Sequence, residues 1–299
     1  MMQATLDIGS NTVRMLIGSC ADGLLQPCLY ERRITRLGGG LSSADGLSAI
    51  AMTRTIAALK DFSDILNINQ AQCLRAVGTA ALRRAENSQQ FIEQVYQQTG
   101  INIDVIDGDE EARLTTLGVL SVIVPCPDNA LIVDIGGGST ELIYFKAGQI
   151  LVQQSFPIGV VRLAEEYSNH DQRQHAIEAT LGDDCRQRFS PLSEPLELIG
   201  TAGTITTLAA MDLKLSHYDP AVINNHRLSV AWMKILYAQL KMLPAMERER
   251  LAGMEPGRGD LILPGLQLVT AIAEAFNVAQ LKVADAGLLE GTFLDAGRD

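Results

Sequence analysis

The sequence predicts an α/β protein of two related lobes. The main observation is an internal duplication: residues 5–12 (TLDIGSNT) resemble residues 133–140 (VDIGGGST), and Asp7 falls on Asp134 with the following Ile-Gly in register. Between the copies, apolar residues switch between the helix spacing of three or four and the strand spacing of two. The length of 299 residues and the 47% of hydrophobic residues suit two globular domains of ordinary size.

Both copies of the duplication continue in the same way. A short apolar strand follows each (15–18 and 142–145), then a turn with glycine (Asp22-Gly23 or Ala147-Gly148) and another alternating segment. The long offset between the copies indicates two related domains rather than a solenoid of short repeats. We expect an N-terminal lobe of residues 1–120 plus 286–299 and a C-terminal lobe of residues 121–285.

The remaining elements follow from periodicity and from residues that end helices. Met52, Ile56 and Leu59 begin an apolar series at helix spacing. Gly100 is a residue type that ends helices, here one that contains Phe91 and Val95. The expected order is a helix over 52–66, strand 73–77, a helix up to Gly100, strand 103–106, strand 196–199, helices over 230–243 and 262–276, strand 281–284 and a closing helix near 289–293.

The two glycine-rich segments predict phosphate-binding hairpins. Each places Asp-x-Gly at the end of a strand, followed by small polar residues and a second strand. Successive N–H groups in such a turn form a concavity that binds anions, and glycine lets a ligand approach the backbone closely. For one copy alone, a turn capped by aspartate is the simpler interpretation, whereas two copies in register favour phosphate. The candidate residues are Gly9, Ser10, Asn11, Thr12, Gly136, Gly137, Gly138, Ser139 and Thr140.

Carboxylates beside a phosphate site indicate a cation between the two charges. Asp7, Asp134 and Glu141 adjoin the hairpins. Mg²⁺ favours carboxylate, water and phosphate oxygens as ligands, so these residues predict a magnesium site.

An acidic run and an arginine add candidates for catalysis. Asp107, Asp109, Glu110 and Glu111 fit the start of a helix, where the helix dipole favours carboxylates. Alternatively, one of them positions a water for attack, as a base whose pKa is raised by the crowded charge. Arg83 follows a strand, where it suits bidentate contact with phosphate, although a solvated surface arginine is the commoner case.

Charge and cysteine content exclude several classes of function. The net charge of −11 disfavours binding to nucleic acids and to anionic membranes. Five cysteines without a C-x-x-C pair fit a reduced, cytoplasmic protein, and neither a signal peptide nor a membrane-spanning stretch is visible. A homodimer is a plausible assembly because twofold dimers are the commonest homo-oligomers.

Together, these motifs resemble the Ppx/GppA phosphatases, the family of exopolyphosphatases and guanosine pentaphosphate phosphohydrolases. The matching segments occur in the family's order over nearly the whole chain, and the pair EEARL (110–114) and GGGSTE (136–141) is the most specific. The other matching segments are DIGSNT (7–12), GTAALR (78–83), GTAGT (200–204) and DAGLLEG (285–291).

The resemblance implies two ribonuclease-H-like lobes of the actin/chaperone/sugar-kinase (ASKHA) fold with an interdomain cleft, of the family's short, two-domain type. It implies hydrolysis of the terminal phosphate of inorganic polyphosphate or of guanosine pentaphosphate, a nucleotide of the stringent response, with Mg²⁺ or Mn²⁺. Glu111 matches the catalytic glutamate. Asp134 and Glu141 match carboxylates near the metal and the attacking water, and Arg83 with the hairpins matches phosphate contacts.

Two alternatives belong to other functional classes. A phosphotransferase of the same fold would need an adenosine pocket and an acceptor site, neither of which the motifs indicate. A weakly catalytic sensor would bind guanosine tetra- or pentaphosphate without turning it over. The presence of Glu111, Asp134 and Glu141 argues against the sensor.

Overall fold

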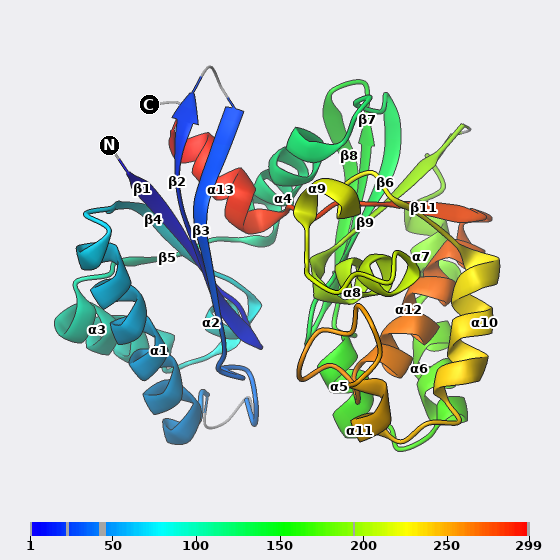
Figure 1. Ribbon diagram of the computed structural model, residues 1–299, viewed down its shortest axis with the longest axis horizontal. Coiled ribbons are helices and arrows are strands. Elements are labelled where there is room, and N and C mark those ends of the chain that lie inside the picture. The colour runs from blue at the N-terminus through cyan, green and yellow to red at the C-terminus, as the bar shows by residue number, and fades with distance from the viewer. Residues whose placement is uncertain (1, 22–23, 42–45, 194, 298–299) are drawn as a thin grey trace. The chain divides into compact units, whose positions relative to one another are not determined.

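The chain folds into two compact α/β units, each with its own sheet and core (Figure 1). The computed structural model describes residues 2–21, 24–41, 46–193 and 195–297. The first unit comprises Met1–Ser121 and Ala286–Asp299, and the second comprises Val122–Asp285. Among the described residues, no helix is both long enough and apolar enough to cross a membrane.

The first unit contains a five-stranded sheet in the order β3-β2-β1-β4-β5. β1, β2 and β3 are antiparallel neighbours, β4 runs parallel to β1, and β5 runs parallel to β4. The strands are β1 Gln3–Ile8, β2 Thr12–Ala21, β3 Leu24–Ile34, β4 Gln72–Gly78 and β5 Ile103–Val105. The helices are α1 Ala49–Ile68, α2 Ala80–Arg84, α3 Ser88–Thr99, α4 Gly108–Val122 and α13 Leu288–Ala296.

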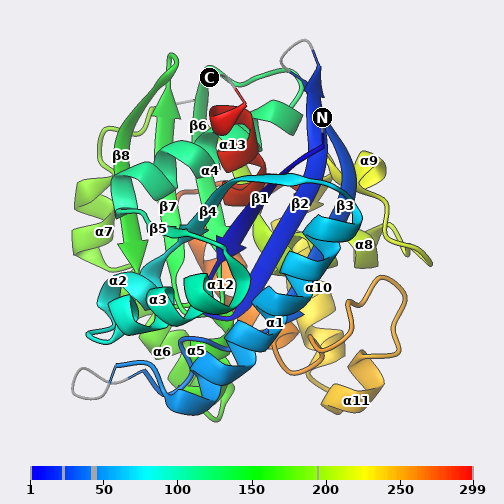
Figure 2. The same ribbon diagram turned by 90° about the vertical axis from the view of Figure 1, so that its left-hand side faces the viewer.

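Alternation along β1 explains why helices cover both faces of this sheet (Figure 2). Leu6 and Ile8 are fully buried in a cluster with α1 and α3. Thr5 points to the opposite face because successive side chains alternate, and its hydroxyl donates to the carbonyl of Leu289 in α13. Asp7 lies on this second face as well, the face that α13 covers.

The second unit contains a six-stranded sheet in the order β8-β7-β6-β9-β11-β10. Its strands are β6 Asn129–Ile135, β7 Thr140–Lys146, β8 Gln149–Phe156, β9 Glu197–Thr201, β10 Arg227–Ser229 and β11 Gln280–Val283. Its helices are α5 Val160–Glu166, α6 His170–Thr180, α7 Asp183–Arg188, α8 Ala202–Asp212, α9 Pro220–Ile223, α10 Val230–Leu240, α11 Ala245–Arg248 and α12 Ile262–Ala275. One face of β6 and β7 packs in a core with α8 and α12.

The duplication seen in the sequence is therefore present in the topology. In each unit, three antiparallel strands are followed by two strands that run parallel to the first, in the spatial order 3-2-1-4-5, and the second unit adds β10 at its edge. This order confirms the predicted fold class: both units are ribonuclease-H-like, as in the ASKHA fold.

Most predicted elements are present close to their predicted bounds. α3 ends at Gly100, whose φ of 72° is the left-handed conformation expected of a glycine cap. β2 and β7 are longer than the predicted strands. The turn at Ala147-Gly148 joins β7 to β8 with positive φ at both residues, whereas the turn expected at Asp22-Gly23 lies outside the described residues.

Candidate active site

The topology of the first unit brings three groups of candidate residues to one edge of its sheet. β1 and β4 end in register at Ile8 and Gly78. The Gly78 carbonyl accepts a hydrogen bond from the N–H of Ile106, just beyond β5, at 3.1 Å. The first hairpin, α2 with Arg83 and α4 with Glu111 therefore all leave from the carboxyl ends of neighbouring strands, where α/β sheets place their ligands.

The two predicted hairpins form the same turn. The N–H of Gly9 donates to the carbonyl of Thr12 at 3.0 Å, and the N–H of Gly136 donates to the carbonyl of Ser139 at 3.0 Å. The Thr140 hydroxyl is buried and donates to the backbone after β8 at 2.6 Å. This hydroxyl thus holds the second hairpin in place and is already engaged in the structure.

Each hairpin is also fixed by the segment that follows the third strand of its sheet. The carbonyl of Asn11 accepts from the N–H groups of residues 35 and 36, at 3.0 and 2.8 Å. The carbonyl of Gly137 accepts from those of residues 161 and 162, at 2.9 and 3.1 Å. The start of α5 therefore supports the second hairpin.

The tips of both hairpins keep backbone donors available. Within the described ranges, no backbone hydrogen bond is donated by Ser10 or Asn11 in the first tip, or by Gly137, Gly138 or Ser139 in the second. All five residues are half-buried rather than fully exposed. A turn with several N–H groups left for a ligand is the arrangement that binds an anion.

The two hairpins carry different charges at the same register position. Asp7 pairs across the strands with Arg14, and Asp134 pairs with Glu141, so the two pairs occupy equivalent places in the two copies. Arg14 donates hydrogen bonds from Nε and Nη2 to Asp7 Oδ2, at 2.9 and 2.6 Å. In the second unit two carboxylates lie directly opposite, and like charges in such a pair repel.

The carboxylate pair of the second unit fits a divalent cation. Mg²⁺ is typically held by one or two carboxylates together with waters and substrate phosphates, and Asp134 with Glu141 supplies two. The Ser155 hydroxyl donates to Glu141 Oε1 at 2.7 Å and orients that carboxylate. In the described part of the chain, no three His, Cys, Asp or Glu side chains converge on one point, so an all-protein cage is absent there.

Asp7 differs from the sequence expectation that it would adjoin a cation directly. Its Oδ2 is paired with Arg14. Its Oδ1 is buried and, in the described residues, has no hydrogen-bond partner. Buried polar atoms nearly always have a partner, so Oδ1 marks a place for a water or another donor beside the first hairpin.

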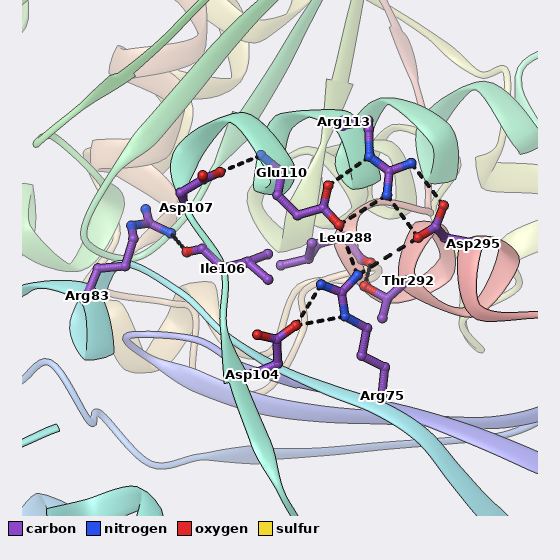
Figure 3. Close-up of polar contacts among 10 residues, drawn as sticks. All are labelled: Arg75, Arg83, Asp104, Ile106, Asp107, Glu110, Arg113, Leu288, Thr292 and Asp295. Atoms are coloured by element: carbon purple, nitrogen blue, oxygen red, sulfur yellow. Dashed lines mark hydrogen bonds and ion pairs between the residues drawn. The ribbon is translucent and has the colours of Figure 1, made fainter. Parts of the chain in front are cut away.

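Arg83 and Glu111 contact each other. Arg83 Nη1 donates to Glu111 Oε2 at 2.6 Å and to the Ile106 carbonyl at 3.0 Å, and the second of these bonds is drawn in Figure 3. Arginine has five N–H donors, and no described hydrogen bond uses Nε or Nη2 of Arg83. One edge of its guanidinium therefore remains for a phosphate while the other edge holds Glu111.

The acidic run begins α4, as the simpler interpretation predicted. Asp107 Oδ1 accepts from the N–H of Glu110 at 2.8 Å, which caps the helix. Within the run, the pKa of Glu110 is lowered to about 2, by hydrogen bonds from Arg113 and then from Arg75. Arginines from other elements outweigh the repulsion within the run.

Sequence reasoning missed three charged residues around these candidates. Arg14 was detectable, because it occupies the place in the first copy that Glu141 occupies in the second. Arg75 and Asp295 carry no local signal, since only packing brings β4 and the end of α13 beside α4.

Two ribonuclease-H-like units, each with a glycine hairpin that follows its first strand, define a protein of the ASKHA class. The chain belongs to the Ppx/GppA phosphatase family, whose model matches residues 16–297. It is accordingly a phosphohydrolase, and membership of this phosphatase family implies dependence on a divalent metal.

Individual relatives agree with this assignment. The chain is 32% identical to "Exopolyphosphatase 2" of Mycobacterium tuberculosis, over 97% of both chains. It is 31% identical to "Guanosine-5'-triphosphate,3'-diphosphate pyrophosphatase" of Aliivibrio fischeri, over 97% of this chain and 58% of the relative. The crystal structure of an exopolyphosphatase from Cytophaga hutchinsonii superposes with a TM-score of 0.86 at 29% identity, over 99% of this chain and 98% of the other.

Proposed function

We propose that the chain releases the terminal orthophosphate of inorganic polyphosphate, of guanosine pentaphosphate, or of both. The observation that carries the proposal is the contact between Arg83 and Glu111 at 2.6 Å, at the sheet edge from which the first hairpin also leaves. An arginine with an edge left for phosphate and a carboxylate held beside it are the parts that phosphoryl transfer to water requires.

The residues of the two hairpins take separate roles in this proposal. Phosphate oxygens are bound by the tip residues Ser10 and Asn11 together with Arg83 in the first unit, and by Gly137, Gly138 and Ser139 in the second. Gly9, Thr12, Gly136 and Thr140 shape the two turns that present these tips. Asp134 and Glu141 would hold Mg²⁺, or Mn²⁺ in its place. When bound, the cation neutralises phosphate charge that the protein, with its net charge of −11, cannot neutralise by itself.

Glu111 is the general base of the proposed reaction. A water oxygen attacks the terminal phosphorus while Glu111 accepts a proton from that water. The bond from phosphorus to the bridging oxygen breaks, and its electron pair stays on that oxygen. The products are orthophosphate and a substrate shorter by one phosphate. Glu141 orients the attacking water as the second catalytic carboxylate.

One side-by-side assay tests the function and ranks the substrates. Phosphate release is measured from polyphosphates of defined length and from guanosine pentaphosphate, with Mg²⁺, with Mn²⁺ and with excess chelator. The relative that matches over nearly its whole length is named an exopolyphosphatase, so we expect release from polyphosphate first. No release from either substrate with either metal would contradict the proposal.

The two alternatives are not favoured. The relatives reported above are named as phosphatases of phosphoanhydrides, not as kinases. A sensor without catalysis would have no use for a carboxylate held by Arg83.

A further inference from the structure

Five charged side chains of the first unit form one connected network (Figure 3). One of them, Glu110, directly precedes the candidate base in the sequence. Arg113 binds Glu110 through Nε and Nη2, at 2.7 and 3.0 Å, and binds Asp295 through Nη1 and Nη2, at 2.9 and 2.8 Å. Arg75 binds Glu110 at 2.9 Å and Asp104 at 3.0 and 2.7 Å. The order along the network is Asp104, Arg75, Glu110, Arg113, Asp295, and a 3.8 Å contact between Arg75 Nη1 and Asp295 Oδ2 closes the last four residues into a ring.

The network joins four separate elements. Arg75 comes from β4, Asp104 from β5, Asp295 from α13, and both Glu110 and Arg113 from the first turns of α4. Arg75 and Asp104 lie on the sheet face that α13 covers, because their neighbours in sequence pack in the core on the opposite face. Glu110 is therefore the point at which α4 is tied to the sheet, and Arg113 the point at which it is tied to α13.

Packing fixes α4 from Ala112 onward, whereas its first turn is held by the network together with Arg83, which binds Glu111 and the Ile106 carbonyl. α4 crosses α13 where Gly118 and Gly291 bring the two backbones into contact, and Leu114 packs with Leu288 in a small buried cluster. Glu110 lies about two turns before the crossing and is half-buried. A helix that is packed along its later turns can still shift at its first turn unless that turn is also tied.

The geometry of these ion pairs is suited to fixing the position of the first turn of α4. Both Arg113 contacts are bidentate, which fixes direction as well as distance. Partly exposed ion pairs contribute little stability singly, but bidentate pairs in a network are the exception. Because the pKa of Glu110 is lowered to about 2, its carboxylate stays ionised, and its ion pairs persist, across the pH range in which the enzyme would work.

We propose that the network is a positioning device for the general base, with Glu110 and Arg113 as positioning residues. Glu111 follows Glu110 in the same helical turn. The ion pairs of Glu110 fix the orientation of this turn, and the orientation of the turn sets where the Glu111 carboxylate meets Arg83. The inference rests on the proposed role of Glu111. Neither positioning residue is assigned a contact with substrate.

The test compares two substitutions that remove the same charge. Glu110→Gln cuts the tie between α4 and the sheet. Asp104→Asn removes the outermost member of the network, which binds only Arg75 among the network residues. This substitution leaves the ion pairs of Glu110 with Arg75 and Arg113 in place. We expect Glu110→Gln to lower kcat about 10- to 100-fold with KM changed less than about twofold, the effect of misplacing a catalytic group. Asp104→Asn should keep kcat within about twofold of wild type.

The pH profile and a third variant separate the possible outcomes. Glu110→Gln should keep the wild-type shape of the kcat–pH profile, since Glu111 remains the base, whereas Glu111→Gln should lose its acidic limb. Wild-type kcat in Glu110→Gln, an equal loss in Asp104→Asn, or a loss of the acidic limb in Glu110→Gln would each overturn the positioning role. Wild-type kcat in Glu111→Gln would instead overturn the proposed base, whatever the network variants show.

Discussion

The guanidinium of Arg83 is large enough to serve two partners at once. Its Nη1 holds Glu111 and the Ile106 carbonyl, and its other edge is open to phosphate. Lysine, as a point charge, could not do both with fixed geometry. The resemblance assigned Arg83 to phosphate and Glu111 to water as separate functions, and the structure couples them through one ion pair.

The sharpest prediction at the residue scale concerns the base. Glu111→Gln should lower kcat by roughly 10²–10⁴-fold, the usual loss when a general base is removed. KM should stay similar or fall, because a negative charge near phosphate is removed. The matched control is Asp109→Asn, an equal charge change at an exposed position in the same helical turn. Comparable losses in both variants would favour helix capping as the function of the run.

A second prediction at this scale concerns the metal. Asp134→Asn removes one of two carboxylates that lie opposite each other in β6 and β7, so the cation should bind more weakly. We expect the Mg²⁺ concentration for half-maximal activity to rise and kcat to fall together. Phosphate release is measured across a Mg²⁺ titration. Full wild-type activity in excess chelator would contradict the metal requirement itself.

At the scale of elements, the crossing of α4 and α13 depends on glycine. A Cβ at position 118 would collide with the carbonyl of Gly287, and one at position 291 with the carbonyl of Leu114. Gly118→Ala should therefore lower the free energy of unfolding by about 2 kcal/mol, a typical overpacking cost. Gly108→Ala in the same helix, where a Cβ meets nothing within 4 Å, is the control for urea unfolding. Equal midpoints for both variants would show that the helices can separate without cost.

The charge network predicts a pH dependence of stability. The pKa of Glu110 falls from 4.5 to about 2 on folding, so its stabilising effect is complete above pH 4.5 and is lost as the pH falls through about 2. The Tm difference between wild type and Glu110→Gln should therefore be largest near neutral pH and shrink on acidification. A difference that stays constant down to about pH 3 would contradict the cause given for the pKa.

The elements that sequence predicted best are those with a local signal. α1 and α12 have apolar residues at helix spacing, and α3 has a glycine cap, so their existence follows from short-range physics. The network around Glu110 was not predictable in this way. Arg75 and Asp295 lie far apart in the sequence and meet only because β4 and α13 pack on the same helix.

At the scale of the whole molecule, the duplication supplied most of the fold. The offset that relates Asp7 to Asp134 also carries the first four strands, β1 to β4, approximately onto β6 to β9. β11, the counterpart of β5, comes later than this offset places it, because further helices and β10 precede it. The candidate residues of the hairpins followed from the same offset. The charge difference between the copies was harder to see from the sequence. It lies in the residue that faces each aspartate on the next strand, which is Arg14 for Asp7 and Glu141 for Asp134.

That difference gives the last prediction. In the first unit Arg14 neutralises Asp7, whose side chain is only 6% exposed, whereas in the second unit Glu141 opposes Asp134. Arg14→Ala should leave the buried Asp7 carboxylate without this charge partner. Because Arg14 itself is 35% exposed, the destabilisation should be about 2 kcal/mol, less than the cost of breaking a fully buried pair. Glu141→Ala removes the repulsion between the two carboxylates along with the Ser155 hydrogen bond, so without metal it should destabilise the protein less than Arg14→Ala does.

Thermal unfolding with and without Mg²⁺ separates the two copies. A cation that binds the native state raises Tm, so wild type and Arg14→Ala should both gain stability from Mg²⁺, because each keeps Asp134 and Glu141. Glu141→Ala should gain little, since one ligand is missing. If Mg²⁺ stabilises Glu141→Ala as much as wild type, the cation does not bind this pair. If Glu141→Ala in chelator is as unstable as Arg14→Ala, the carboxylates do not repel, and the two hairpins have not diverged into an ion pair and a metal site.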